Sequence, residues 1–102
     1  MVYFLYKIFR KKPKFEFDPA KSHLNKKKHG IDFVEAQMLW EDKYSTESSA
    51  RSDVENRFIV IGMIREKHYT ACITYRDEVI RIISVRRARE KEVADYEHRK
   101  IR

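Results

Sequence analysis

The stretch 57-RFIVIGMIREKHYTACITYRDEVIRIISVR-86 contains three runs rich in β-branched and aromatic residues, at 57–65, 68–76 and 79–86. Residues of these types favour β-strands. Two-residue spacers, Glu66-Lys67 and Asp77-Glu78, separate the runs and predict an antiparallel meander. Neither spacer contains the Gly or Asn typical of the tightest hairpins, so the strand registers stay open at this point.

The segment before the meander, 15-FEFDPAKSHLNKKKHG-30, predicts a short strand followed by a helix. Glu16 alternates with two phenylalanines, as expected of a strand. Asp18 is a favourable N-cap, and Pro19 suits the first position of a helix. We expect this helix to run to about His29, because Gly30 offers the left-handed residue that commonly follows a helix.

A second helix is expected over residues 31–42, where Asp32 and Glu35 have the spacing of a capping box. Phe33, Ala36 and Trp40 recur at helical spacing and would lie on its buried face. This helix should supply the large side chains that cover the sheet.

Two segments remain. Residues 43–56 are polar and predict a short strand and then a loop, whereas residues 87–102 lack Gly and Pro and predict a helix with a narrow apolar stripe. The expected fold class is α+β, in the order β-α-α-β-β-β-β-α. It is a small antiparallel sheet packed with N-terminal helices and a C-terminal helix.

The length of 102 residues suits one domain, which we expect to span residues 15–102 after a basic and apolar extension at residues 1–14. The net charge is +7, of which the extension holds +5, so the pI alone overstates the basic character of the domain. The extension is too short to cross a membrane and lacks the features of a secretory signal. The single cysteine, Cys72, fits the reducing cytoplasm.

Arginines interrupt the strand-forming runs in a way that predicts an anion site. Strict alternation along residues 79–86 puts Arg81 with Val79, Ile83 and Val85 on one face, and Ser84 and Arg86 on the other. Arg57 and Arg65 bracket the first run, and Tyr75 lies near the end of the second. Arginine binds phosphate oxygens with two parallel hydrogen bonds, so a phosphodiester is the expected guest.

The histidines and acids show no metal-ligand spacing, and no Gly-rich phosphate loop is present, so we expect no cofactor. A nuclease of this composition would cleave RNA without metal. It would use the 2′-OH of the RNA as nucleophile, a base, an acid, and cations around the crowded phosphate.

Simpler roles compete with catalysis. In the simpler interpretation, His29 stabilises the end of a helix and has no catalytic role. The lysines near it are then solvated surface residues, and the arginines at strand ends are charges that protect the edges of the sheet. On that basis the alternative function is a basic nucleic-acid-binding α+β module without catalysis. A third class is a protein whose weakly amphipathic last helix docks onto another chain.

Several short motifs occur in a characteristic order. They are FEFDPAK at 15–21, Asn25, KHG at 28–30, Phe33, EA at 35–36, Glu55 with Arg57, IG at 61–62, and residues 81–92 with Tyr96. In this order the sequence resembles the BrnT family of ribonuclease toxins from bacterial type II toxin–antitoxin systems. The resemblance covers residues 15–97. The sequence has Val85 where a small residue is usual, and the loop before Glu55 has fewer acids than is common.

The resemblance implies a RelE-like fold, RNA cleavage and inhibition of translation. It also implies neutralisation by a BrnA-like ribbon-helix-helix antitoxin in an assembly of two toxins with two antitoxins, which contacts operator DNA only through the antitoxin. Carried over by position, the catalytic candidates are His29, Arg57, Arg81, Arg86, Glu55 and Tyr75. The candidates for RNA and phosphate binding are Lys28, Arg65, Ser84 and Arg87.

Overall fold

The computed structural model describes residues 12–50 and 56–101 of the chain. Most of the expected N-terminal extension, as well as Glu55 in the expected site, lies outside the described residues. The elements are β1 (Lys14–Glu16), α2 (Pro19–His29), η1 (Glu35–Glu41), β2 (Thr46–Ala50), β3 (Arg57–Ile64), β4 (Lys67–Arg76), β5 (Val79–Arg87) and α3 (Glu90–Lys100). The fold is α+β, as expected.

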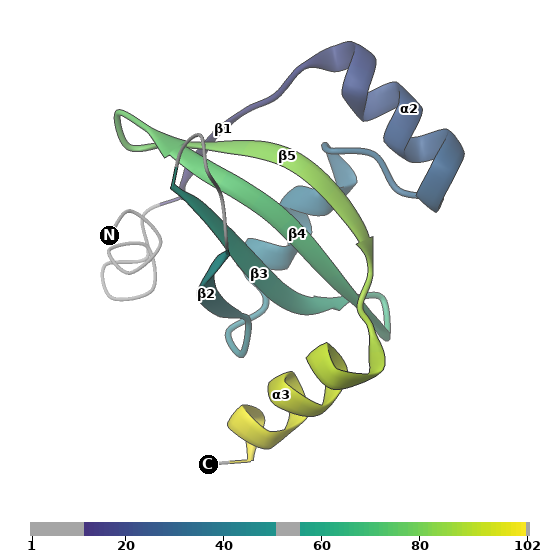
Figure 1. Ribbon diagram of the computed structural model, residues 1–102, viewed down its shortest axis with the longest axis vertical. Coiled ribbons are helices and arrows are strands. Elements are labelled where there is room, and N and C mark those ends of the chain that lie inside the picture. The colour runs from purple at the N-terminus through teal and green to yellow at the C-terminus, as the bar shows by residue number, and fades with distance from the viewer. Residues whose placement is uncertain (1–11, 51–55, 102) are drawn as a thin grey trace.

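The five strands form one sheet in the order β1-β5-β4-β3-β2 (Figure 1). β3, β4 and β5 pair antiparallel and form the expected meander, and β2 adds a further antiparallel strand beside β3. β1, however, pairs with β5 in parallel, so the sheet is mixed rather than antiparallel. Alternation in residues 14–16 indicates a strand but carries no information on its partner, which here lies more than sixty residues away in the sequence.

Both hairpins of the meander turn through residues with positive φ. Arg65 and Glu66 have φ of 50° and 71°, and Asp77 and Glu78 have φ of 49° and 71°. Two consecutive positive φ angles are the geometry of a type I′ turn, whose twist matches that of the flanking strands. The first turn lies one residue earlier than the expected spacer, because Lys67 already pairs with Ile64 in the ladder.

Helix α2 has the expected ends. The Asp18 carboxylate accepts hydrogen bonds from the backbone N–H groups of Ala20 (2.9 Å) and Lys21 (3.4 Å), and Gly30 follows the helix with φ of 77°. The buried Asn25 fixes α2 to the sheet. Its amide donates to the carbonyl of Val85 (2.8 Å) and accepts from the N–H of Val85 (3.3 Å), so it extends the ladder at the edge of β5.

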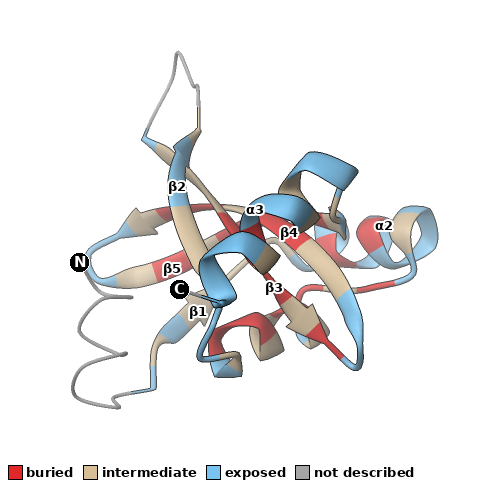
Figure 2. Cartoon of the chain, turned by 90° about the horizontal axis from the view of Figure 1, so that it is seen from below, coloured by how far each residue is buried: buried red, intermediate tan, exposed pale blue. Residues whose placement is uncertain are grey.

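The second expected helix is a 3₁₀ helix, η1. Its capping pair forms as expected: Asp32 accepts from the N–H of Glu35 (2.8 Å), and Glu35 accepts from the N–H of Asp32 (2.9 Å). Buried residues gather on η1 and on the middle of the sheet (Figure 2). The hydrophobic core consists of Ile31, Phe33, Ala36, Leu39, Trp40, Val60, Ile64, Ala71, Ile73, Ile80, Ile82 and Val85.

A β-bulge in β5 changes which side chains share a face. Ile73 pairs with Ile82 while Cys72 pairs with Ser84, so Ile83 is the extra residue. Below, the side of the sheet that carries Ile73 and Ile82 is called the η1 face, because η1 packs on it. The other side, which carries Cys72 and Ser84, is called the α3 face.

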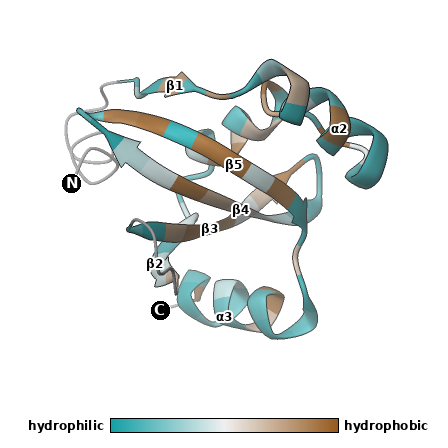
Figure 3. Cartoon of the chain, turned by 45° about the horizontal axis from the view of Figure 1, so that its top comes forward, coloured by the Kyte–Doolittle hydropathy of each residue, from teal (hydrophilic) through white to brown (hydrophobic). Residues whose placement is uncertain are grey.

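The bulge corrects the expected face assignment of β5. Thr74 pairs with Arg81, Cys72 with Ser84, and Thr70 with Arg86. Alternate residues of β4 point to one face, so all three β5 partners lie on the α3 face. Strict alternation had separated Arg81 from Ser84 and Arg86, and the single extra residue brings them together. In Figure 3, β5 is a hydrophobic strand with a hydrophilic interruption.

Helix α3 begins at Glu90, three residues later than expected, because Arg87 still pairs with Tyr69 in the sheet. The helix docks through Tyr96, which is 1% exposed and whose ring lies 5.2 Å from that of His68 on the α3 face. α3 therefore covers one end of this face. Over the described residues, none of the helices is both long enough and apolar enough to cross a membrane.

Candidate functional site

Beyond helix α3, the α3 face carries two arginines in one row across the sheet. Arg81 pairs with Thr74 on β4, and the β3–β4 register continues to put Arg57 opposite Thr74 on the other side. Adjacent strands lie about 4.8 Å apart, so the Cα atoms of the two arginines are about 10 Å apart. Because an extended arginine side chain is longer than half that distance, two guanidinium groups in this row can meet one phosphate.

An acidic residue of β1 holds one of these arginines. Glu16 pairs with Arg81 in the parallel ladder, and its carboxylate accepts a hydrogen bond from Nη1 of Arg81 at 3.0 Å. The same oxygen lies 3.9 Å from Nη1 of Arg76. The contact with Glu16 fixes the Arg81 side chain on the α3 face, and the side chain is 28% exposed, so it is open to solvent. The parallel position of β1 is what places the carboxylate there.

Arg86 lies on the same face but is already engaged. Its guanidinium donates to both carboxylate oxygens of Glu92 on α3, at 2.8 and 2.9 Å. Glu92 also accepts from the Thr70 hydroxyl (2.9 Å) and from the N–H of Arg89 (2.8 Å). These donors, Arg86 first, lower the pKa of Glu92 to about 2, and the carboxylate raises the pKa of Arg86. Arg86 thus fastens α3 to the sheet.

Ser84 lies between these two ends. It is exposed, it follows the bulge, and its cross-strand neighbour is the partly buried Cys72. Ile59 of β3 pairs with Cys72 and completes this middle row. Between the row of arginines and the edge of α3, the α3 face therefore has a hydroxyl donor and a partly apolar surface.

Two other expected residues lie on the opposite face. Tyr75 has its hydroxyl on Glu47 at 2.5 Å and its ring 5.3 Å from that of Phe58. Arg87 pairs with Tyr69, whose ring its guanidinium overlies at 5.7 Å. Alternation puts both on the η1 face, so the structure does not bring them together with Arg81.

The last expected residues lie at the margins of the sheet. His29 and Lys28 end α2, with His29 partly buried and Lys28 exposed. Arg65 is exposed in the β3–β4 turn. Of the expected set, the α3 face therefore collects Arg57, Arg81, Ser84 and Arg86.

Three residues of this face went unnoticed in the sequence: Glu16, Thr74 and Glu92. Thr74 is 3% exposed, and its hydroxyl donates to the carbonyl of Asn56 at 2.6 Å, which fixes the start of β3 beside Arg57. Glu92 had a signal, since it stands three residues after Arg89 and forms a capping box there. Glu16 had none, because its contact depends on the partner of β1.

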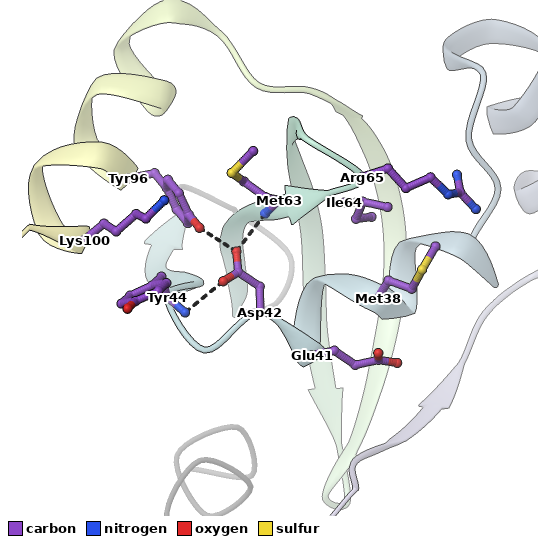
Figure 4. A pocket seen from close by; sticks show the side chains of 9 residues that line it. All are labelled: Met38, Glu41, Asp42, Tyr44, Met63, Ile64, Arg65, Tyr96 and Lys100. Carbon is purple, nitrogen blue, oxygen red and sulfur yellow. Dashed lines mark hydrogen bonds between the residues drawn. The ribbon is translucent and has the colours of Figure 1, made fainter.

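A second concavity, of about 400 Å³, lies where α3 meets η1 and β3 (Figure 4). In it, Asp42 accepts from the Tyr96 hydroxyl (2.7 Å), the Met63 N–H (2.8 Å) and the Tyr44 N–H (2.9 Å). Burial of the Tyr96 hydroxyl, and secondly its hydrogen bond to Asp42, raise the pKa of Tyr96. These contacts anchor the second half of α3, so we interpret this concavity as a structural junction.

In residues 12–50 and 56–101, no three His, Cys, Asp or Glu side chains group closely enough to hold a metal ion. A family model described as "Ribonuclease toxin, BrnT, of type II toxin-antitoxin system" matches residues 17–92. The matched range contains every strand from β2 to β5, and it ends in the first turn of α3 at Glu92. No curated protein matches the chain.

Proposed function

Because the chain belongs to the BrnT family of type II toxin–antitoxin ribonuclease toxins, we propose that it is a metal-independent endoribonuclease that inhibits translation. The observation that carries this proposal is the row of Arg57 and Arg81 on the α3 face, with Ser84 beside it. Arginines in this arrangement can bind a phosphodiester and stabilise the additional charge of its transition state.

In the proposed reaction the 2′-oxygen of the RNA attacks the neighbouring phosphorus and the bond from phosphorus to the 5′-oxygen breaks. The products are a 2′,3′-cyclic phosphate and a free 5′-hydroxyl. A base removes the proton of the 2′-OH, and an acid protonates the leaving 5′-oxygen. Arg57 and Arg81 bind the non-bridging oxygens, and Ser84 donates a hydrogen bond to the same group.

We assign proton transfer to His29 and Glu55. His29 ends α2, whose Asn25 is bonded to β5, and Glu55 stands two residues before Arg57 in the sequence. Tyr75 is left out of the set, since its side chain lies on the η1 face. Arg86 receives a positioning role, because both its terminal nitrogens bind Glu92.

As a type II toxin, the chain would be neutralised by an antitoxin protein. We propose that this partner is of the BrnA type, that two toxins and two antitoxins assemble, and that the toxin acts in the cytoplasm, where its RNA substrate is. We also propose that the fold of the chain is RelE-like. Co-expression followed by measurement of the mass of the purified complex tests the stoichiometry.

The catalytic proposal is tested by the Arg81→Ala and Arg57→Ala variants, assayed for cleavage of total RNA in the presence of EDTA. Losing one arginine of a preorganised site should cost about 2.7–4 kcal/mol of transition-state stabilisation, a loss of about 10²–10³ in rate. Arg99→Ala, which removes an exposed arginine of α3, is the matched control. Growth arrest in cells expressing each variant should follow the same order.

Two outcomes would reject the proposal. If folded Arg81→Ala and Arg57→Ala variants cut RNA at the rate of the Arg99→Ala control, the α3 face is not the active site. If the native protein binds RNA in a salt-dependent manner but yields no product with or without EDTA, the chain is a binding module without catalysis.

A further inference from the structure

Helix α2 carries an unusual distribution of charge. It contains four lysines and two histidines and no acidic residue, and it is largely hydrophilic in Figure 3. Of these lysines, Lys26 is paired, with its Nζ 2.8 Å from Glu35 of η1. For Lys21, Lys27 and Lys28, the described part of the chain supplies no acidic partner within ion-pair distance.

The contacts of α2 fix how it is rotated against the sheet. Successive residues turn by about 100° around the axis. Lys26 points toward η1, which covers the η1 face, and Asn25 points at the edge of β5. Lys21 and Lys28 lie about 40–60° beyond Asn25, on the side away from Lys26. They therefore border the α3 face across the edge of β5.

Leu24 occupies the same flank. It lies three residues after Lys21 and four before Lys28, which makes the three residues one stripe along the helix, called the α2 stripe below. Leu24 is 61% exposed, one of few large apolar side chains so open among the described residues. An apolar side chain between two lysines suits a ligand with charged and flat apolar parts, as single-stranded RNA has in its phosphates and bases.

The stripe lies next to the site. The Asn25 side chain forms two hydrogen bonds with the backbone of Val85, and the exposed Ser84 is the neighbouring residue on the α3 face. Lys21 and Lys28 are separated by seven residues, about 10 Å along the axis, which is the rise of about three stacked nucleotides. A strand that leaves Arg81 over Ser84 would cross the edge of β5 and reach the stripe.

We propose that the α2 stripe is an extended RNA-binding subsite. Lys21 and Lys28 bind the phosphates of nucleotides next to the cleaved bond, and Leu24 packs on a base. This inference rests on the proposed ribonuclease function and adds the requirement that the substrate is single-stranded and extends beyond the two nucleotides at the cleaved bond.

The test compares two double variants with the same change in net charge. Lys21→Ala/Lys28→Ala removes the stripe lysines, and Lys27→Ala/Lys91→Ala removes two exposed lysines outside the stripe, one on another face of α2 and one on α3. Alanine keeps the helix, since it is the best helix former. The probe is a fluorescent single-stranded RNA of about 12 nucleotides with 2′-O-methyl groups throughout, which binds but cannot be cleaved. Its affinity is measured by anisotropy at several salt concentrations.

Each phosphate contact contributes about 0.7 to the slope of log affinity against log salt for a single strand, so the stripe variant should lose about 1.4. The control should keep the native slope. Leu24→Ala should weaken binding at every salt concentration without changing the slope, because an apolar contact releases no counterions. The effect of the stripe variant should shrink with a probe of about four nucleotides.

The proposal is overturned if the stripe variant keeps the slope of the control. It is also overturned if the stripe lysines govern binding of an oligoglutamate peptide but not of RNA, since the stripe would then dock an acidic protein. Cleavage of unmodified RNA is measured in parallel. If the native protein cleaves RNA but the stripe variant keeps the native salt slope of binding, only the α2 stripe proposal is rejected. If the stripe variant loses slope but the native protein does not cleave RNA, only the catalytic function is rejected.

Discussion

At the scale of single residues, the α3 face separates two kinds of arginine. Arg81 has one hydrogen bond to a carboxylate at the sheet edge and keeps solvent access. Arg86 has both terminal nitrogens bound by Glu92, which ties it to α3. Two arginines five positions apart on one strand therefore differ in the acidic partners that hold them.

The pair of Arg86 and Glu92 predicts a pH dependence of stability. The pKa of Glu92 in the folded protein is about 2, below its ordinary value of 4.5. A lowered pKa means that the ionised carboxylate stabilises the fold above about pH 4.5, and that this contribution is lost as pH falls toward 2. Glu92→Gln should therefore cost about 2–3 kcal/mol near neutral pH and much less near about pH 2.

Urea unfolding of the native protein and of Glu92→Gln at several pH values measures this difference. Glu90→Gln, which changes an exposed acid in the same turn, controls for the helix dipole. Parallel stability curves for the native protein and Glu92→Gln, separated by the same amount at all pH values, would show that the pKa of Glu92 is not lowered by folding.

At the scale of elements, much of the fold is predictable because its signals are local. The three meander strands, both ends of α2, and the capping pair of η1 follow from residues within a few positions of one another. The 3₁₀ form of η1, the parallel partner of β1 and the bulge at Ile83 carry no such local signal, and β1 pairs with residues 65 positions away. The bulge matters most, since it alone unites Arg81 with Ser84.

The type I′ turns predict a stabilising substitution. Glu78 has φ of 71°, where a side chain with Cβ is strained and glycine is not. Glu78→Gly should stabilise the protein by about 0.5–1 kcal/mol, because relief of strain exceeds the entropy that glycine gains on unfolding. Glu78→Ala removes the same charge but keeps Cβ, so thermal unfolding should show no comparable gain. A fall in melting temperature for Glu78→Gly would contradict the turn geometry.

The close approach of η1 to β3 predicts a destabilising substitution at Gly62. A Cβ at Gly62 would lie 3.1 Å from Cδ2 of Leu39, 3.1 Å from Cβ of Ser45 and 3.3 Å from Oδ2 of Asp42. Leu39 is fully buried, and protein interiors are close-packed, so the added methyl meets resistance there. Gly62→Ala should therefore cost about 1–3 kcal/mol by overpacking, measured by urea unfolding.

A double-mutant cycle separates overpacking from a general effect of alanine. Leu39→Ala should be destabilising alone, yet the combination with Gly62→Ala should cost clearly less than the sum, because the smaller side chain makes room for the added methyl. Strict additivity of the two changes would rule out this contact as the cause.

At the scale of the whole molecule, the two sheet faces have different tasks. The η1 face holds the hydrophobic core, whereas the α3 face carries the arginines and the helix that borders them. The composition predicts one core and a moderate positive charge but not this division, since the face of every β5 residue after Ile82 depends on the bulge. Identifying the candidate site therefore required the topology as well as the residue types.

The distribution of the core also predicts where the folding unit begins. Among the residues that the structure describes, those of the hydrophobic core lie between Ile31 and Val85, and the first strand of the sheet starts at Lys14. We therefore expect a chain without residues 1–11 to fold. The sole tryptophan, Trp40, is 2% exposed in the core and reports on it.

In the shortened chain, tryptophan fluorescence and far-UV circular dichroism should lose their folded signals in one coincident urea transition, as expected of a single domain of this size. Its urea dependence should stay close to that of the full chain, because the slope follows the surface exposed on unfolding and the core is retained. A chain that lacks a cooperative transition, or whose two probes change at different urea concentrations, would show that residues 1–11 belong to the folding unit.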